Sequence, residues 1–286
     1  MAEGDSIRRL ADRINGRFAG QRVLRCVTRD PRLVGVDLTD AVLVGADAAG
    51  KHLLMRFDDG RTVHAHLRID GSIVVGRRSD AEPFRKRLEL SFDGGMLTAV
   101  DVPVLEVVTT ADESRVVGHL GPDVCAAVAP DLDDIAGRLV RQADAPVAAA
   151  LLDQRNVAGF GNVYAVEVPF IAGVSPNQPV GSIGGLVDLV DLGVALIRHA
   201  MRGGPRNTTG RRLESADHWV YAKRGRPCPL CGTRLAGWTD ADSPWRRVSV
   251  WCPQCQPLAD DRDVDTARIA RLLALHPARR NLSRRR

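Results

Sequence analysis

Residues 228–255 read CPLCGTRLAGWTDADSPWRRVSVWCPQC and hold two Cys-x2-Cys pairs, Cys228 with Cys231 and Cys252 with Cys255, separated by 20 residues. Each pair supplies two thiolates on a tight turn, and two such turns close a tetrahedral site with zinc about 2.3 Å from each sulfur. Four protein ligands leave no open coordination position, so we expect one structural Zn2+ ion. Redox-active cysteines are the main alternative. The stretch predicts a zinc ribbon.

Arg246 and Arg247 lie between the two cysteine pairs, on what would be a strand of the zinc-ribbon hairpin. They are flanked by Trp245 and Trp251. A guanidinium group held beside an aromatic surface suits a phosphate. The alternative is a solvated arginine pair without a ligand.

Length and charge limit the class of protein. The chain has 286 residues and a formal net charge of +5, and its length allows two or three domains. Between Arg198 and Cys255 there are eleven Lys and Arg against four Asp and Glu, a balance of +7. This local surplus favours a polyanionic partner, although a solvated charged face has the same composition. The sequence has no export signal and no run of 18 apolar residues, so we expect a cytoplasmic protein without a membrane span.

Hydrophobic periodicity divides the chain into a β-rich first half and a helical middle. Residues 5–18 have apolar side chains at helical spacing, which predicts an amphipathic helix capped by Asp5 or Ser6. Turns at Asp58-Asp59-Gly60 and Asp93-Gly94-Gly95 predict two hairpins and, with their neighbours, a β-sandwich or barrel. Further helices are predicted at residues 131–143, 146–155 and 184–201, with a glycine-rich joint at 157–164 and a short helix at 266–275.

Five motifs occur in one order: Met1-Ala2-Glu3-Gly4-Asp5, Gly50-Lys51-His52-Leu53, His66-Leu67-Arg68-Ile69-Asp70-Gly71-Ser72, Leu151-Leu152-Asp153-Gln154 through Gly159-Phe160-Gly161-Asn162, and the cysteine quartet. This order resembles the formamidopyrimidine-DNA glycosylase/endonuclease VIII family over roughly residues 1–256. It is particularly similar to the actinobacterial endonuclease VIII-like members.

The resemblance implies a multidomain α+β protein with DNA bound in a cleft between its domains. A β-sandwich with an N-terminal helix is expected at residues 1–125, a helix–two-turn–helix domain at 126–222 and a zinc-ribbon finger at 223–256. Residues 257–286 lie outside the resemblance and are expected to form a basic tail.

The resemblance further implies a base-excision-repair glycosylase that removes oxidised bases and nicks the abasic site through a Schiff base on its N-terminal amine. An α-amine has an ordinary pKa of about 7.7–8.0, so part of it is a free nucleophile at neutral pH. Glu3 matches the family's general acid, and Lys51 matches the hairpin lysine that contacts phosphate near the lesion. Without the resemblance, Glu3 is a favourable carboxylate at a helix N-terminus and Lys51 an exposed strand lysine.

The N-terminal position departs from the family. The family has a proline after the removed methionine, and this chain has Ala2. A proline iminium is always charged, whereas an imine on a primary amine is charged only when it is protonated. We therefore expect β-elimination to be slower or more dependent on pH, with the attack geometry loosened by the loss of the proline ring.

Other matching positions imply contacts to the DNA backbone. Gly161 and Asn162 match the glycine joint whose N–H groups and side-chain donor meet a phosphate at a helix N-terminus. Arg247, five residues before Cys252, matches the zinc-finger arginine that grips the phosphate beside the flipped nucleotide, with Arg246 as the substitute for that role.

Arg68 and Ile69 occupy the position of the family's void-filling loop, which makes Ile69 the expected wedge for base extrusion. The alternative is an ordinary hydrophobic turn of a hairpin. Residues 101–105 lack the Arg-Arg-Phe wedge of the formamidopyrimidine branch, which favours oxidised pyrimidines as substrates.

Three classes of function remain open. The first is the glycosylase and lyase, expected to be a nucleoid-associated monomer with damaged DNA as its partner. The second is a non-catalytic or lyase-deficient damaged-DNA-binding homologue, favoured by Ala2 alone. The third, a ribbon-bearing protein-interaction module, leaves the N-terminal and glycine-joint motifs unexplained.

Overall fold

The computed structural model describes residues 2–203, 206–211, 217–239 and 248–282. The chain divides into two compact units, Met1–Leu120 and Gly121–Arg286. No helix among these described residues is long and apolar enough to cross a membrane.

The first unit is organised around helix α1 (Gly4–Phe18), which confirms the helix predicted at residues 5–18. Its buried stripe consists of Ile7, Leu10, Ala11, Ile14 and Phe18. The N-cap is Glu3, whereas the sequence suggested Asp5 or Ser6. Ser6 contributes from inside the first turn, because its hydroxyl oxygen accepts a hydrogen bond from the Glu3 N–H at 3.0 Å.

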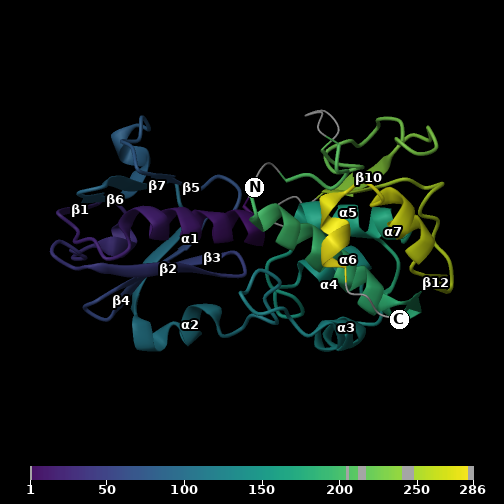
Figure 1. Ribbon diagram of the computed structural model, residues 1–286, viewed down its shortest axis with the longest axis horizontal. Coiled ribbons are helices and arrows are strands. Elements are labelled where there is room, and N and C mark those ends of the chain that lie inside the picture. The colour runs from purple at the N-terminus through teal and green to yellow at the C-terminus, as the bar shows by residue number, and fades with distance from the viewer. Residues whose placement is uncertain (1, 204–205, 212–216, 240–247, 283–286) are drawn as a thin grey trace. The chain divides into compact units, whose positions relative to one another are not determined.

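Two four-stranded antiparallel sheets lie on either side of α1 (Figure 1). One has the order β2 (Leu43–Ala49), β3 (His52–Phe57), β4 (Arg61–His66), β8 (Val104–Thr109). The other has the order β1 (Arg25–Thr28), β6 (Lys86–Phe92), β7 (Gly95–Val100), β5 (Ser72–Val75). Short helical turns occupy the connections, namely η1 (Pro31–Leu33), η2 (Pro83–Arg85), η3 (Thr110–Asp112) and α2 (Ser114–Val117). The predicted β-sandwich is confirmed.

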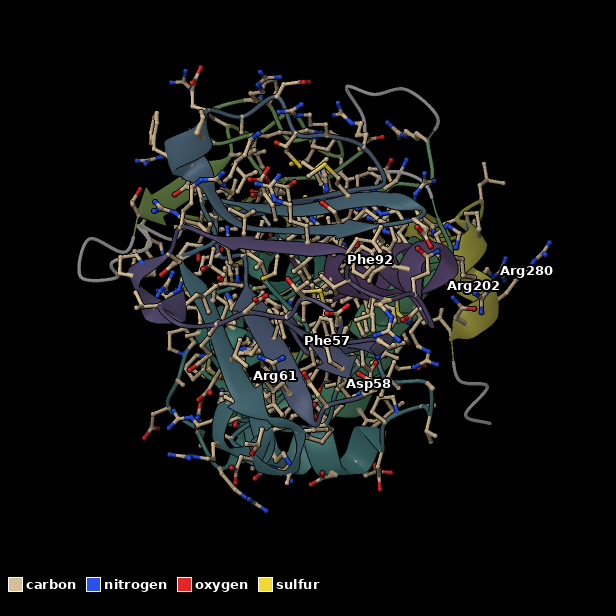
Figure 2. All side chains as sticks on the ribbon, turned by 90° about the vertical axis from the view of Figure 1, so that its left-hand side faces the viewer. Phe57, Asp58, Arg61, Phe92, Arg202 and Arg280 are labelled. Atoms are coloured by element: carbon tan, nitrogen blue, oxygen red, sulfur yellow. The ribbon has the colours of Figure 1, made fainter. Side chains whose placement is uncertain are left out.

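Side chains of α1 tie the two sheets together. Asn15 donates to the Ala46 carbonyl at 2.7 Å and accepts from the Ala46 N–H at 2.6 Å, which covers the edge strand β2. Arg17 donates to the Gly94 carbonyl in the β6–β7 turn at 2.9 Å. Phe57 on β3 and Phe92 on β6 are both buried (Figure 2), and Phe92 stacks on Phe18. The core of this unit therefore lies around the helix, between the sheets.

Both predicted hairpins are present. Strands β3 and β4 pair through the Asp58-Asp59-Gly60 turn, and β6 and β7 pair through Asp93-Gly94. In the first turn the Asp59 carboxylate accepts from the Arg61 N–H at 3.0 Å, and Gly60 has φ +80°, so the residue types demanded by the turn are those the sequence supplies.

The second unit is built around α5 (Asn162–Ala172), all eleven residues of which are buried. It packs against α4 (Val147–Leu152), α6 (Leu186–Met201) and α7 (Thr266–Leu272), and α3 (Leu132–Val140) packs against α6 and α4. The predicted helices at 131–143, 146–155, 184–201 and 266–275 correspond to α3, α4, α6 and α7. Periodicity does not predict helix α5, because a helix that is apolar on every side has no amphipathic period; only its N-terminus, at Gly161 and Asn162, was implied by the resemblance.

The segment expected to be a basic tail is part of the second unit as far as residue 282. Its strand β12 (Arg262–Asp263) pairs in parallel with β9 (Ile183–Gly184), and α7 follows. Arg262 donates to the Gly173 carbonyl at 2.9 Å, and Arg268, which is 8% exposed, donates to the Phe170 carbonyl at 2.8 Å. These carbonyls belong to the C-terminal end of α5, where cationic side chains are favourable. The arginines of this segment therefore stabilise the fold.

Candidate catalytic site and nucleic-acid interface

The candidate nucleophile Ala2 lies directly before α1. Its main-chain nitrogen donates to the Arg68 carbonyl at 3.5 Å, and the residue is half-buried. Glu3 follows and is fully buried, at the N-terminus of α1. The structure thus brings Ala2, Glu3 and the loop that contains Arg68 together within the first unit.

The loop between β4 and β5 holds the expected wedge. Ile69 is 43% exposed, so its side chain is available at the surface of the loop. Arg68 has φ +52°, in the left-handed region that is costly for a residue with a side chain. The turn closes through the Gly71 N–H and the Leu67 carbonyl at 2.9 Å, and a Cβ at Gly71 would lie 2.6 Å from that oxygen. Glycine is therefore required at position 71.

Lys51 occupies the turn between β2 and β3 and is half-buried. Its charge contributes to the lowered pKa of His52 and of His66. The charge of Arg68 likewise contributes to the lowered pKa of His66. Two cations of the candidate site therefore act on one group of histidines.

This group, called the histidine cluster below, consists of His52, His64, His66 and His119. The rings of His52 and His64 are stacked with centroids 5.0 Å apart, while His66 and His119 meet His52 edge-on at 4.8 and 5.8 Å. The sequence analysis assigned it no role. A signal was present, because His64 and His66 alternate on β4 and His66 pairs with His52 across the hairpin, which places all three on one face.

A hydrogen-bond chain orders the cluster. Glu106 accepts from His64 Nδ1 at 2.9 Å, and His64 Nε2 lies 2.7 Å from His52 Nδ1. When His64 donates a hydrogen bond to the carboxylate through Nδ1–H, its Nε2 can accept a hydrogen bond from His52 Nδ1–H. His66 Nδ1 accepts the Arg68 N–H at 3.2 Å, which leaves its ring proton on Nε2.

Burial keeps two of these rings neutral. It lowers the pKa of His52 to about 3, with further contributions from His66, His64, His119 and Lys51. Burial, followed by the charges of Lys51 and Arg68, lowers the pKa of His66 to about 4. At neutral pH both rings are hydrogen-bonding groups without charge.

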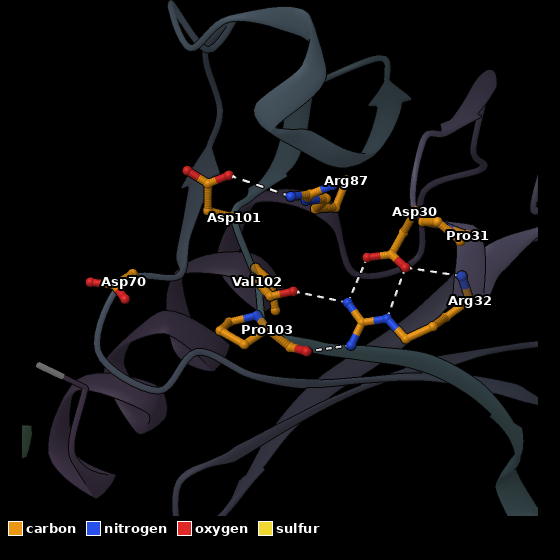
Figure 3. Close-up of a pocket in the computed structure, with 8 residues that line it drawn as sticks. All are labelled: Asp30, Pro31, Arg32, Asp70, Arg87, Asp101, Val102 and Pro103. Atoms are coloured by element: carbon orange, nitrogen blue, oxygen red, sulfur yellow. Dashed lines mark hydrogen bonds and ion pairs between the residues drawn. The ribbon is translucent and has the colours of Figure 1, made fainter. Parts of the chain in front are cut away.

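A pocket of about 490 Å³ lies beside the β4–β5 loop, between the β7–β8 turn and η1 (Figure 3). Arg32 in its wall is bound by Asp30 at 2.5 Å and by the Val102 carbonyl at 3.2 Å. Asp101 pairs with Arg85 at 2.6 Å and with Arg87 at 3.8 Å. Because these guanidinium groups already have carboxylate partners, the pocket is not a phosphate site.

In the second unit, a turn anchored by Gln154 precedes α5. Gln154 accepts the Gly159 N–H at 3.0 Å and donates to the Phe160 carbonyl at 2.9 Å. Gly159 has φ +105°, and its N–H is used inside the turn, so its contribution is the backbone conformation. Gly161 is the N-cap of α5 and Asn162 its first residue, which is the expected arrangement for both.

A buried carboxylate of α5 anchors the chain around Trp219. Glu167 is 0% exposed and accepts from the main-chain N–H groups of Trp219, Val220 and Tyr221 at 2.7–2.8 Å and from the Thr208 hydroxyl. Sequence reasoning missed Glu167, because α5 itself was not predicted.

The four cysteines form one cluster. The sulfur atoms of Cys228, Cys231, Cys252 and Cys255 all lie within 4.8 Å of one another, beside the hairpin of β10 (Ala236–Thr239) and β11 (Val248–Trp251). The closest pairs are 3.5 to 3.9 Å apart, and a tetrahedral zinc site requires roughly 3.8 Å. The cluster can bind a metal ion. Arg246 and Arg247 lie outside the described residues.

Two family models match the first unit and the beginning of the second unit. The formamidopyrimidine-DNA glycosylase N-terminal domain matches residues 1–103, and the formamidopyrimidine-DNA glycosylase H2TH domain matches residues 120–191. The chain therefore belongs to the formamidopyrimidine-DNA glycosylase/endonuclease VIII family, as the motifs predicted.

Relatives from actinobacteria match about nine-tenths of the chain. A probable endonuclease 8 2 of Streptomyces coelicolor is 40% identical over 265 residues, covering 90% of this chain and 94% of the relative. The DNA-(apurinic or apyrimidinic site) lyase Nei2 of Mycolicibacterium smegmatis is 34% identical over 258 residues, covering 90% and 99%.

Solved structures show the same fold. The MutM (Fpg) protein of Thermus thermophilus superposes with a TM-score of 0.73 at 27% identity, over 90% of this chain and 99% of that protein. The Lactococcus lactis enzyme, solved with DNA that contains an AP site, gives 0.74 at 23% identity, over 89% and 99%. The predicted fold class is confirmed.

Proposed function

We propose that this protein is a base-excision-repair DNA glycosylase with associated AP-lyase activity, acting on oxidised bases and preferentially on pyrimidines. The names of its relatives support the activity: endonuclease 8, formamidopyrimidine-DNA glycosylase and AP-site lyase. The preference for pyrimidines rests on the missing Arg-Arg-Phe wedge at residues 101–105.

The chemistry begins at Ala2 once the initiator methionine has been removed. Its amine attacks C1′ of the extruded nucleotide and displaces the base, while Glu3 protonates the opening sugar ring. Lys51 holds a phosphate beside the lesion, and Ile69 fills the space left by the extruded base. The observation that carries this proposal is the contact between the Ala2 nitrogen and the Arg68 loop, beside the buried Glu3 carboxylate.

The second unit supplies further contacts to the DNA backbone. Helix α5 has eleven residues, and Gly161 and Asn162 lie at its N-terminus. They supply hydrogen-bond donors for a DNA phosphate at this helix end. Arg247, with Arg246 as its substitute, holds the phosphate beside the flipped nucleotide, and Arg68 contributes from the loop.

Zinc is the metal we assign to the cysteine cluster. Four thiolates at tetrahedral spacing are the ligand set of structural zinc, and no ligand position remains for substrate. We assign the catalytic domain to residues 1–125, the helix–two-turn–helix domain to 126–222 and the zinc finger to 223–256. The final segment begins at residue 257. We further propose a monomer that binds damaged DNA at the nucleoid.

The test is excision of an oxidised pyrimidine from a labelled duplex. The full-length protein should release the base and cut the strand, and Glu3→Gln should lose base release. Glu82→Gln, a change at an exposed glutamate of the same unit, is the matched control and should keep wild-type rates. Base release without strand scission would indicate the lyase-deficient homologue that Ala2 favours. Binding of damaged duplex without either reaction would overturn the proposal.

A further inference from the structure

The main chain of Arg68 is hydrogen-bonded through both of its polar groups, which belong to successive peptide units. Its N–H donates to His66 Nδ1 at 3.2 Å, and its carbonyl accepts from the Ala2 nitrogen at 3.5 Å. Arg68 also has φ +52°, a conformation that is unfavourable for a residue with a side chain and persists where its surroundings hold it. The position of this carbonyl is therefore set by His66 and by the turn that closes at Gly71.

We propose that the Arg68 carbonyl, held by His66, is the hydrogen-bond acceptor that keeps the Schiff base on Ala2 protonated. The inference rests on the proposed lyase function. It explains how a chain with alanine in place of the family's proline sustains a charged intermediate. His66 is in this view a positioning residue, which acts through the Arg68 main chain.

The acceptor matters at the imine stage of the lyase reaction. The Ala2 nitrogen bonds to C1′ of the ring-opened abasic sugar, and the C1′ oxygen leaves as water. The alanine-derived imine then takes up a proton, and only this N–H+ form draws electrons. β-Elimination breaks the C2′–H bond, whose proton passes to water, and the C3′–O bond, whose phosphate leaves. The 3.5 Å contact is long for a neutral donor, and a charged N–H+ donor shortens such contacts to about 2.7–2.9 Å.

A proline iminium has no N–H and gains nothing from this acceptor. At the imine stage the carbonyl can bind only an intermediate formed from a primary amine, so the arrangement around Arg68 and the residue at position 2 are chemically matched. A hydrogen bond to a charged group shifts the protonation equilibrium of the imine toward the charged form by about tenfold to a hundredfold. This shift raises the imine pKa by about one to two.

His66 can hold the Arg68 N–H only while its Nδ1 carries no proton. The groups that face its ring are Lys51 and His52 from the β2–β3 region, His64 on its own strand, and Arg68, with His119 beyond His52. The cations among them and the burial of the ring oppose its protonation. The acceptor therefore stays available at neutral pH.

The experiment measures single-turnover scission of a duplex with one abasic site from about pH 6 to about pH 9, a range that spans the ordinary α-amine pKa. The wild-type rate should fall at the alkaline end, where the imine loses its proton. His66→Gln removes the acceptor at the Nδ1 position and should move this fall about one pH unit lower. His66→Asn places its side-chain oxygen where Nδ1 was, and should keep the wild-type profile.

Ala2→Pro supplies the second control. Its iminium cannot lose a proton, so its profile should lack the alkaline fall, and adding His66→Gln to Ala2→Pro should change neither rate nor profile. Retention of the rate in this double variant shows that His66→Gln leaves the fold intact. His199→Asn, on α6 of the other unit, is the matched histidine control and should behave as wild type.

Three results would overturn the inference. One is an unchanged alkaline limb in His66→Gln, and another is an equal loss in the alanine and proline backgrounds. The third is rescue by glutamine instead of asparagine, which would assign the role of His66 to its Nε2 atom and a direct ligand. Absence of scission in the wild type itself would refute the proposed lyase function instead.

Discussion

Glu167→Gln should destabilise the second unit strongly, although the two side chains have almost the same shape. The carboxylate is 0% exposed and faces only donors, three main-chain N–H groups and the Thr208 hydroxyl. A glutamine amide replaces one of the two oxygens by an NH2 group. That group can only donate. Placed beside Thr208, it can donate to the hydroxyl oxygen, because the hydroxyl has a second acceptor in the Asp217 carbonyl at 3.2 Å, so the Trp219 N–H is the donor that loses its acceptor.

The magnitude follows from the lost Trp219 bond and from the weaker bonds that Val220 and Tyr221 make to a neutral amide oxygen. A hydrogen bond to a charged group contributes about 1.5–3 kcal/mol, and removing one partner leaves the other unsatisfied in the interior. Part of this loss is offset because the buried charge is removed as well. We expect the free energy of unfolding to fall by about 3–4 kcal/mol, a large part of the ~5–15 kcal/mol typical of a folded domain.

Tryptophan fluorescence is a suitable probe, because all four tryptophans lie between residues 219 and 251. Trp219, whose N–H is bound by Glu167 at 2.8 Å, is 3% exposed. With a urea dependence of about 2 kcal/mol per M, the midpoint should move by roughly 1.5–2 M. Glu82→Gln, at an exposed position, should leave it unchanged. A shift below about 0.3 M in Glu167→Gln would refute this reasoning.

Three further predictions concern other parts of the chain. Metal analysis should find one zinc ion per chain, and Cys231→Ser should lower both the zinc content and the thermal midpoint; a metal-free wild type with normal stability would contradict this. Because the folded pKa of His66 is about 4 and its ordinary value 6.5, this ring should cost the first unit up to about 3 kcal/mol as pH falls from 6.5 to 4, and His66→Asn should lose less in urea titrations followed by far-UV circular dichroism, since the tryptophans lie in the second unit. Ile69→Ala should slow base excision from duplex about tenfold and from single strands little, since only a duplex has a base pair to open; equal slowing would exclude a wedge.

Local patterns allowed most of the first unit to be predicted. The apolar stripe of α1 and the Asp-Gly turns of both hairpins are properties of short segments, so they could be read without knowledge of the fold. The cysteine pairs are a further case, because two adjacent turns already fix the ligand spacing.

Features that depend on long-range packing could not be predicted in this way. Helix α5 has no polar face, because neighbours far away in the sequence cover it on all sides. The segment after residue 257 was expected to be a charged tail, yet its arginines bind the carbonyls at the end of α5. Charge alone does not distinguish a solvated arginine from one that caps a helix.

The candidate site falls between these cases. Its residues Ala2, Glu3 and Lys51 were selected through motifs, whereas the contact between Ala2 and Arg68 depends on how α1 packs beside the β4–β5 loop. The histidine cluster was accessible in principle from the alternation of His64 and His66, but its partner Glu106 enters only through the pairing of β4 with β8.

The most direct measurement is to trap the mature protein with borohydride on a duplex that contains one abasic site and to map the adduct by mass spectrometry. We predict an N-terminus that begins at Ala2 and a reduced sugar attached to its nitrogen. A retained initiator methionine, or an adduct on a lysine such as Lys51 with Ala2 unmodified, would contradict the proposed chemistry.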